Sequence, residues 1–280
     1  MALPEPVQRR LAGRPVTIDG NTLATDIQLM LRMQRLARLP GAETLPLAEG
    51  RETVRLTAAH TAGDQPIGEV RSLRVADLPA RLYVPSGAPA TGPLLVFFHG
   101  GGFFCGDLDS HDGSCRFLAE QAGVRVLSVD YRLGPEHPFP AGHDDAVAAY
   151  AWTVEHAAEL GADPDRLGVG GDSAGGNLSA VVAIEAARQG WPMAVQLLVY
   201  PATQSGRETR SAELFSEGFY LTQAFMDQAD RLYSPGVPAD EPRLSPMRAE
   251  LPAGLAPALV YTAGFDPLRD EGEALSLIHI

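Results

Sequence analysis

The 280-residue sequence predicts an α/β fold with a mostly parallel central sheet and helices on both faces. Residues 94–98 are apolar throughout, as in a strand buried on both sides. From there to residue 200, short apolar runs alternate with helix-like segments, which is typical of parallel strands joined by helices. Residues 68–85 read instead as a hairpin and supply an antiparallel edge.

The elements follow in order along the chain. A helix is predicted over residues 22–39, where apolar residues recur at helical spacing. After the hairpin, strands are expected near residues 94–98, 124–130, 166–170, 195–200 and 258–263. Helices are expected near residues 112–122, 142–160, 175–189 and from 270 onward. Residues 203–245 interrupt this alternation and contain a further helix pattern over 221–233.

Composition excludes several classes of partner. The net charge of −13 argues against nucleic acid and against an anionic membrane. We see no apolar run of 18 residues and no signal-peptide pattern, so we expect a cytoplasmic protein without a membrane segment. The only two cysteines, Cys105 and Cys115, give no disulfide framework.

The most specific motif is Gly-Asp-Ser-Ala-Gly at residues 171–175. It joins an apolar strand pattern to an Ala-rich helix pattern, which is the context of a nucleophile elbow. Its glycines permit a turn too tight for flanking side chains, and the turn presents the Ser173 hydroxyl at a helix N-terminus. A plain turn would explain the glycines alone, but this context favours Ser173 as a nucleophile.

A second motif, His-Gly-Gly-Gly at residues 99–102, directly follows the buried strand at 94–98. Successive glycines leave backbone N–H groups accessible to a ligand. We therefore predict an oxyanion hole from the N–H groups of Gly101 and Gly102, completed by Ala174 after the serine.

These motifs, with residues 130–141 and 266–272, resemble the hormone-sensitive lipase-like family of α/β-hydrolases, in particular its bacterial GDSAG esterases. The resemblance covers nearly the whole chain. It implies a serine carboxylesterase for small esters of short to medium acyl chains, working without cofactor or metal. It also implies a helical cap made of residues 1–45 and an insertion at about 203–245, over a hydrolase domain spanning residues 46–274.

The acid of the triad is predicted to be Asp266. It follows the strand pattern near 258–263, at the sheet edge where ligands bind in such folds. Capping of the next helix is a compatible role, because a proline follows the aspartate. We expect Asp270 and Glu271 to lie on a solvated first turn.

No histidine suits the role of general base. Those at 60, 99, 111, 137, 143 and 156 all precede Ser173, and the resemblance assigns His99 and His111 to organising the glycine loop. His279 lies 13 residues after Asp266, which leaves no room for a helix, a strand and a returning loop. We therefore expect the catalytic histidine to be absent and this chain to be inactive.

The C-terminal tail offers an explanation. Residues 275–280 read Leu-Ser-Leu-Ile-His-Ile, and a back-translation resembles a transposon adapter of sequencing libraries. We interpret residues 275–280 as non-native and expect them to break the last helix after one turn. The last strand and helix of the fold would then be missing. The alternative is the genuine short C-terminus of a degenerate homologue.

Two other functions stay open. A non-catalytic small-molecule binding protein on the same fold would keep the pocket and lose the histidine. An amidase or another acyl transferase would keep the triad.

Overall fold

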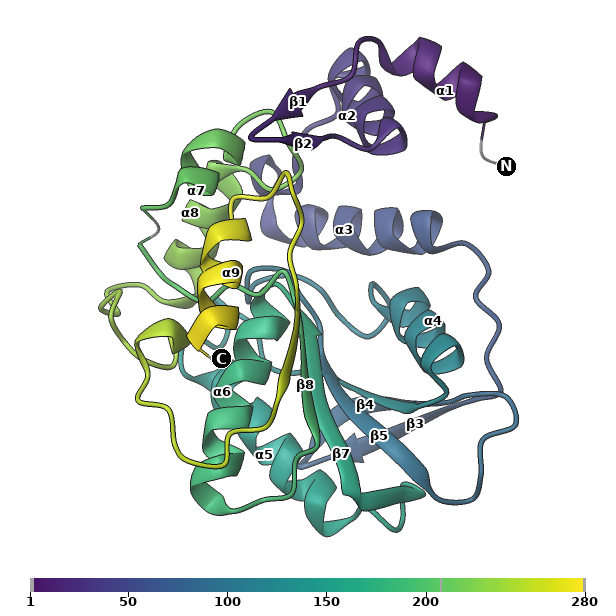
Figure 1. Cartoon of the computed structure of the whole chain (residues 1–280), viewed down its shortest axis with the longest axis vertical. Coiled ribbons are helices and arrows are strands. Elements are labelled where there is room, and N and C mark those ends of the chain that lie inside the picture. The colour runs from purple at the N-terminus through teal and green to yellow at the C-terminus, as the bar shows by residue number, and fades with distance from the viewer. Residues whose placement is uncertain (1–2, 207, 279–280) are drawn as a thin grey trace.

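A seven-stranded sheet forms the centre of the computed structural model, which describes residues 3–206 and 208–278 (Figure 1). Its strand order is β3-β4-β6-β5-β7-β8-β9. The strands are β3 (Glu69–Val75), β4 (Leu78–Val84), β5 (Gly92–Phe98), β6 (Arg125–Val129), β7 (Ala162–Asp172), β8 (Val195–Val199) and β9 (Ala258–Tyr261). Strands β6, β5, β7, β8 and β9 are parallel to one another, and β3 and β4 form the antiparallel edge.

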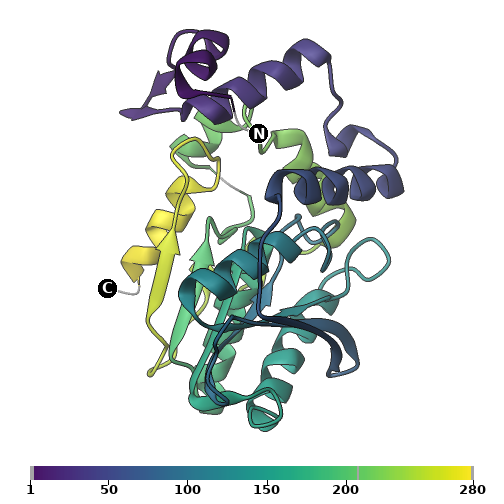
Figure 2. The ribbon, with the colours of Figure 1, turned by 90° about the vertical axis from the view of Figure 1, so that its right-hand side faces the viewer.

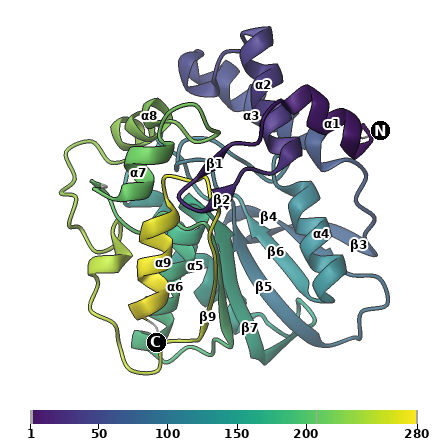
Figure 3. The ribbon, with the colours of Figure 1, turned by 45° about the horizontal axis from the view of Figure 1, so that its top comes forward.

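Helices cover both faces of this sheet, which confirms the predicted fold class. Three lie on one face, α5 (Ala141–Glu155), α6 (Ala174–Gln189) and α9 (Arg269–Ile278), and α4 (Asp112–Ala122) lies on the other (Figure 3). Strand β5 shows why the run at 94–98 is apolar throughout. Val96 packs into the cluster with α5 and α6, whereas Phe97 packs into the cluster with α4.

Most of the remaining elements lie beyond the carboxyl ends of the parallel strands (Figures 1 and 2). They are α1 (Glu5–Ala12), β1 (Thr17–Ile18), β2 (Asn21–Thr22), α2 (Thr25–Ala37), η1 (Ala42–Thr44), α3 (Leu47–Ala62), α7 (Arg210–Phe215) and α8 (Gln223–Tyr233). The short helix η2 (Pro246–Arg248) instead packs beside α6 and α9. The N-terminal part and the 203–245 insertion touch each other, since Thr222 Oγ1 donates to Glu43 Oε1 at 3.0 Å. A cap built from these two segments requires such a contact between them.

Two expectations about the C-terminal helix were wrong. Helix α9 continues to Ile278 instead of breaking after one turn, and Leu275 is buried against Ala180 and Leu198. Glu271 is 1% exposed rather than solvated, because its carboxylate accepts the Thr203 N–H at 2.7 Å. Burial of one face therefore fixed this helix where local sequence suggested a break.

Strand β9 forms one edge of the sheet within the described residues. Leu259 and Tyr261 on this strand are each 62% exposed, because α9 covers only the opposite face. None of the helices in residues 3–206 and 208–278 combines the length and apolar character needed to cross a bilayer.

Candidate active site

Ser173 occupies a strained corner between β7 and α6. Its φ is +54°, a value that few residues other than glycine adopt. Its N–H donates to the Val199 carbonyl at 2.9 Å, and its side chain is half-buried. A Cβ on Gly175 would overlap the Phe98 carbonyl, so the helix can approach β5 this closely only with glycine. The local geometry is therefore that of the predicted elbow.

The glycine loop after β5 lies beside this corner. Gly101 and Gly102 have φ values of +117° and +59°, which explains the choice of glycine. In the part of the chain that the structure describes, the N–H groups of Gly101, Gly102 and Ala174 donate no hydrogen bond. Backbone donors left unpaired around a nucleophile elbow can bind a developing oxyanion.

Asp172 joins the elbow to the glycine loop, a role that the sequence analysis missed. Its Oδ1 accepts the Gly100 N–H at 3.0 Å, and its carboxylate lies 3.3 Å from His111 Nε2. Burial opposes ionisation of both groups, but their mutual attraction prevails. It lowers the pKa of Asp172 and raises the pKa of His111. The position next to Ser173 was the available signal for this residue.

Asp266 lies in the turn after β9, at the same edge of the sheet as Ser173. Asp172, Val199 and Tyr261 are aligned in register across β7, β8 and β9, so both turns start at one level. Asp266 Oδ1 accepts the Leu268 N–H at 2.9 Å, which is the capping role considered above. Tyr200 lies between the two turns: burial, together with the charges of Asp172 and Asp266, raises its pKa.

None of the six described histidines hydrogen-bonds to Ser173. His143 is fully buried, with its two ring nitrogens bonded to Tyr233 and Asn177, and burial lowers its pKa to about 4. His99 stacks on Tyr131 and bonds to the Gly100 carbonyl, and burial also lowers its pKa to about 4. His279 lies outside the described residues.

Arg51 of α3 braces the glycine loop. Its Nε donates to the Phe104 carbonyl at 2.7 Å and its Nη2 to the Gly134 carbonyl at 2.8 Å. Two further bonds of 2.7 Å reach the Glu136 carboxylate. Sequence reasoning could not find this residue, because its partners lie 53 to 85 positions away.

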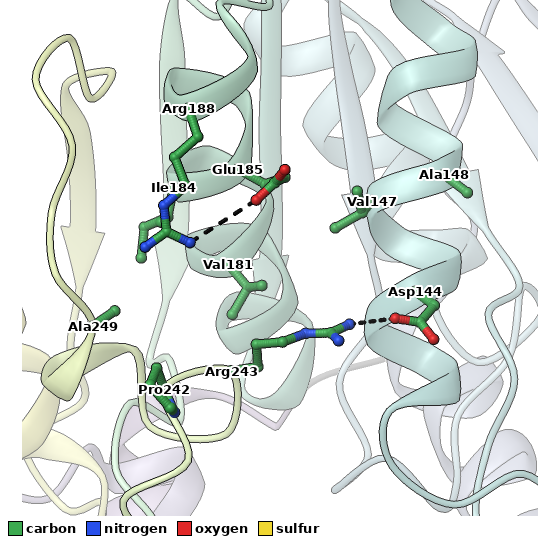
Figure 4. A pocket seen from close by; sticks show the side chains of 10 residues that line it. All are labelled: Asp144, Val147, Ala148, Val181, Ile184, Glu185, Arg188, Pro242, Arg243 and Ala249. Carbon is green, nitrogen blue, oxygen red and sulfur yellow. Dashed lines mark hydrogen bonds and ion pairs between the residues drawn. The ribbon is translucent and has the colours of Figure 1, made fainter.

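The described residues contain no group of three or more His, Cys, Asp or Glu side chains that could hold a metal ion. A hollow of about 370 Å³ lies between α5, α6 and the segment around Arg243 (Figure 4). Val147 and Val181 form part of its wall, and the Arg243–Asp144 ion pair of 2.5 Å crosses it. None of the predicted site residues lines it, so it is separate from the candidate active site.

Comparison with known proteins identifies relatives across most of the chain. Residues 95–277 match the family model described as alpha/beta hydrolase fold. The carboxylic ester hydrolase LipN of Mycobacterium tuberculosis is 50% identical over 97% of this chain and 76% of its own length. An ethyl acetate hydrolase of Pseudomonas putida is 38% identical over 90% and 83%. The hyperthermophilic esterase of Pyrobaculum calidifontis superposes with a TM-score of 0.85 at 37% identity, covering 92% of this chain and 86% of its own.

Proposed function

Because the chain belongs to the alpha/beta hydrolase fold family, we propose that it is built to hydrolyse carboxylic esters through a serine nucleophile. The observation that carries this proposal is the position of Ser173. It lies at a positive-φ corner, and the nearby N–H groups of Gly101, Gly102 and Ala174 donate no hydrogen bond to any described residue.

In the proposed reaction, Ser173 Oγ attacks the ester carbonyl carbon and loses its proton to a base. The carbonyl oxygen becomes an oxyanion held by the three N–H groups. The intermediate collapses to an acyl-enzyme and releases the alcohol, which takes up a proton. Water then attacks the acyl-enzyme, which releases the carboxylic acid and restores the serine. Asp266 would orient the base, as the acid does in such triads.

The base is the part of this machinery that the described residues do not supply. We propose that these 280 residues turn over esters very slowly, because none of the six described histidines reaches Ser173. The same observation favours a second candidate, a small-molecule binding protein that keeps the fold and pocket without turnover.

The substrate class follows from the cap. Helices α2 and α8 of the proposed cap lie over the carboxyl ends of the strands, and Phe225 of α8 packs against Phe104 close to Gly102. We propose that this cap limits the acyl group to short or medium length and excludes water from the acyl-enzyme.

Labelling by a fluorophosphonate, followed by peptide mass spectrometry, tests the nucleophile. Imidazole is added as an external base. We expect one adduct, on Ser173, which Ser173→Ala abolishes and Ser86→Ala, an exposed control serine, leaves intact. An adduct elsewhere would refute the proposed nucleophile.

Turnover of p-nitrophenyl butyrate tests the missing base separately. Without imidazole, we expect the chain to stay within about twofold of Ser173→Ala; with imidazole, only the unaltered chain should accelerate beyond the background. If the chain turns over rapidly and His279→Ala stops it, the claim of a missing base is wrong and the esterase proposal stands. Labelling without any turnover under both conditions would favour the binding protein.

A further inference from the structure

Positive charge is concentrated at the N-terminus of an acidic protein. Residues 1–40 contain six arginines against three acidic residues, a net charge of +3. The other 240 residues carry −16. The whole-chain charge of −13 therefore hides a basic segment, which the structure folds into α1, the β1–β2 hairpin and α2. We call residues 3–39 the α1–α2 unit.

The same unit exposes several large apolar side chains. Val7 and Leu11, about 40° apart around α1, are 43% and 46% exposed. Met33 and Leu36, about 60° apart around α2, are 54% and 68% exposed. Leu39, just after α2, is also exposed. Single exposed leucines are ordinary, but apolar stripes on two adjacent helices indicate a contact surface.

The stripes are held outward because the opposite sides of both helices are fixed. Ala12 on α1 and Leu31 on α2 are buried. Gln28 is 6% exposed, and its side-chain amide donates to the carbonyls of Ala12 at 3.0 Å and Arg14 at 2.8 Å. The unit therefore cannot bury its stripes by rotating either helix without losing these bonds.

Three arginines border the apolar stripes, and no described acidic residue pairs with them. Arg10 lies about 60° from Val7 around α1, and Arg32 about 40° from Leu36 around α2. Both side chains are exposed, as is Arg38. Within residues 3–206 and 208–278, Arg10, Arg32 and Arg38 form no ion pair.

We propose that the α1–α2 unit binds a lipid surface carrying anionic headgroups. Exposed apolar stripes bordered by arginines are the two features that hold an amphipathic helix in such an interface. The acidic remainder of the chain does not prevent this, because salt screens charges beyond about 10 Å at about 0.1 M. An acidic protein partner or a second copy of this chain would have to cover these same apolar stripes to compete with the lipid surface.

Binding there would bring the candidate active site close to the lipid surface. In the β1–β2 turn, Asp19 pairs with Arg269 at 2.7 Å. A Cβ on Gly264 would lie 3.2 Å from Asn21, so the hairpin packs against the turn that carries Asp266. Binding of the α1–α2 unit to lipid does not depend on the proposed esterase function. A role of this binding in the uptake of apolar esters does rest on that function.

Vesicle sedimentation of the 280-residue chain tests the proposal. We expect binding to phosphatidylcholine vesicles containing about 30% phosphatidylglycerol, and much weaker binding without phosphatidylglycerol or at high salt. Replacing Arg10, Arg32 and Arg38 together by glutamine should lower the partition coefficient on the order of 100-fold, at roughly fivefold for each arginine. Met33→Asp with Leu36→Asp should abolish binding.

Matched controls separate local contact from general charge. Arg71, Arg166 and Arg248 are exposed arginines on the rest of the protein, and their joint replacement by glutamine changes the net charge equally. Phe117→Asp alters an exposed aromatic on α4 in the same way. Both controls should bind like the unaltered chain, and melting curves of all variants verify folding.

Equal loss in the control variants would overturn the proposal, as would absence of binding to the anionic vesicles. Light scattering after size exclusion tests whether a second copy of the chain covers the stripes. A dimer that dissociates in the Met33→Asp and Leu36→Asp double variant would show that it does, and would also overturn the lipid proposal.

Discussion

Replacing Arg51 tests how helix α3 stabilises the glycine loop. In the structure its guanidinium joins α3 to the Phe104 carbonyl, the Gly134 carbonyl and the Glu136 carboxylate. Arg51→Ala removes all these bonds and leaves two backbone carbonyls without their charged donor. Arg51→Lys keeps the charge but presents a compact ammonium that cannot serve all three partners.

The magnitude follows from these contacts. A hydrogen bond to a charged group contributes about 1.5–3 kcal/mol, and we take the low end because the Arg51 side chain is 28% exposed. The two carbonyl bonds then contribute about 3 kcal/mol. The Glu136 pair adds less than about 1 kcal/mol, since that carboxylate is half exposed. At about 3–4 kcal/mol in all, Arg51→Ala should lower the Tm of a protein of this size by about 6–16 °C.

Two assays check this expectation. Thermal melting should rank the chains as unaltered, Arg51→Lys and Arg51→Ala in falling order of Tm. Hydrogen–deuterium exchange should show faster exchange in residues 99–106 for Arg51→Ala, because the loop loses its brace to α3. Glu136→Gln is the matched control: it removes only the ion pair, and its Tm should fall by no more than about 4 °C.

The pH dependence gives a further check. The Arg51 hydrogen bond holds the pKa of Glu136 at about 2, below its ordinary value. The stabilisation by the Arg51–Glu136 ion pair is therefore fully present above about pH 4.5 and is lost as pH falls towards 2. The difference in Tm between the unaltered chain and Glu136→Gln should shrink over this range. If Arg51→Ala melts like the unaltered chain and exchange in residues 99–106 does not change, the bracing role is refuted.

Three further predictions concern other sites. Gly102→Val should slow fluorophosphonate labelling at least about 100-fold, since its φ is +59° and a Cβ would lie 3.1 Å from Phe225; labelling within twofold of the original would remove Gly102 from the oxyanion hole. Between pH 6.5 and 4 the histidine at position 143 is protonated in the unfolded chain but not in the folded one, so stability falls as pH falls. His143→Gln should reduce this pH dependence of the free energy of unfolding, measured by urea unfolding at each pH. An unchanged pH dependence would contradict the pKa of about 4. Leu259→Lys with Tyr261→Lys should reduce light scattering on storage, because both side chains are exposed on β9, the edge strand of the sheet among the described residues. Unchanged scattering would place the aggregation surface elsewhere.

The sequence by itself determined the sheet and the order of its elements. The apolar run at 94–98, the hairpin at 68–85 and the helix pattern at 175–189 all appear within a few residues of their predicted bounds. These signals are local, because a buried strand or an amphipathic helix shows its burial in the residues of that element alone. The elbow at Ser173 and the glycines at 101 and 102 could be predicted for the same reason: each glycine is required by its own backbone conformation or by a close approach.

Only the tertiary structure decided which distant residues complete the site. Arg51 reaches the glycine loop across 53 residues, and nothing near it in the sequence indicates that contact. The position of Asp172 beside Ser173 could draw attention to it, but not to its contact with the loop 72 residues earlier. Helix α9 runs on to Ile278 because Leu275 is buried against α6, although the local sequence predicted a break. The basic α1–α2 unit was likewise hidden in the whole-chain charge, since net charge sums over residues that folding places far apart. Local patterns record what each segment buries, whereas contacts between segments exist only once the chain has folded.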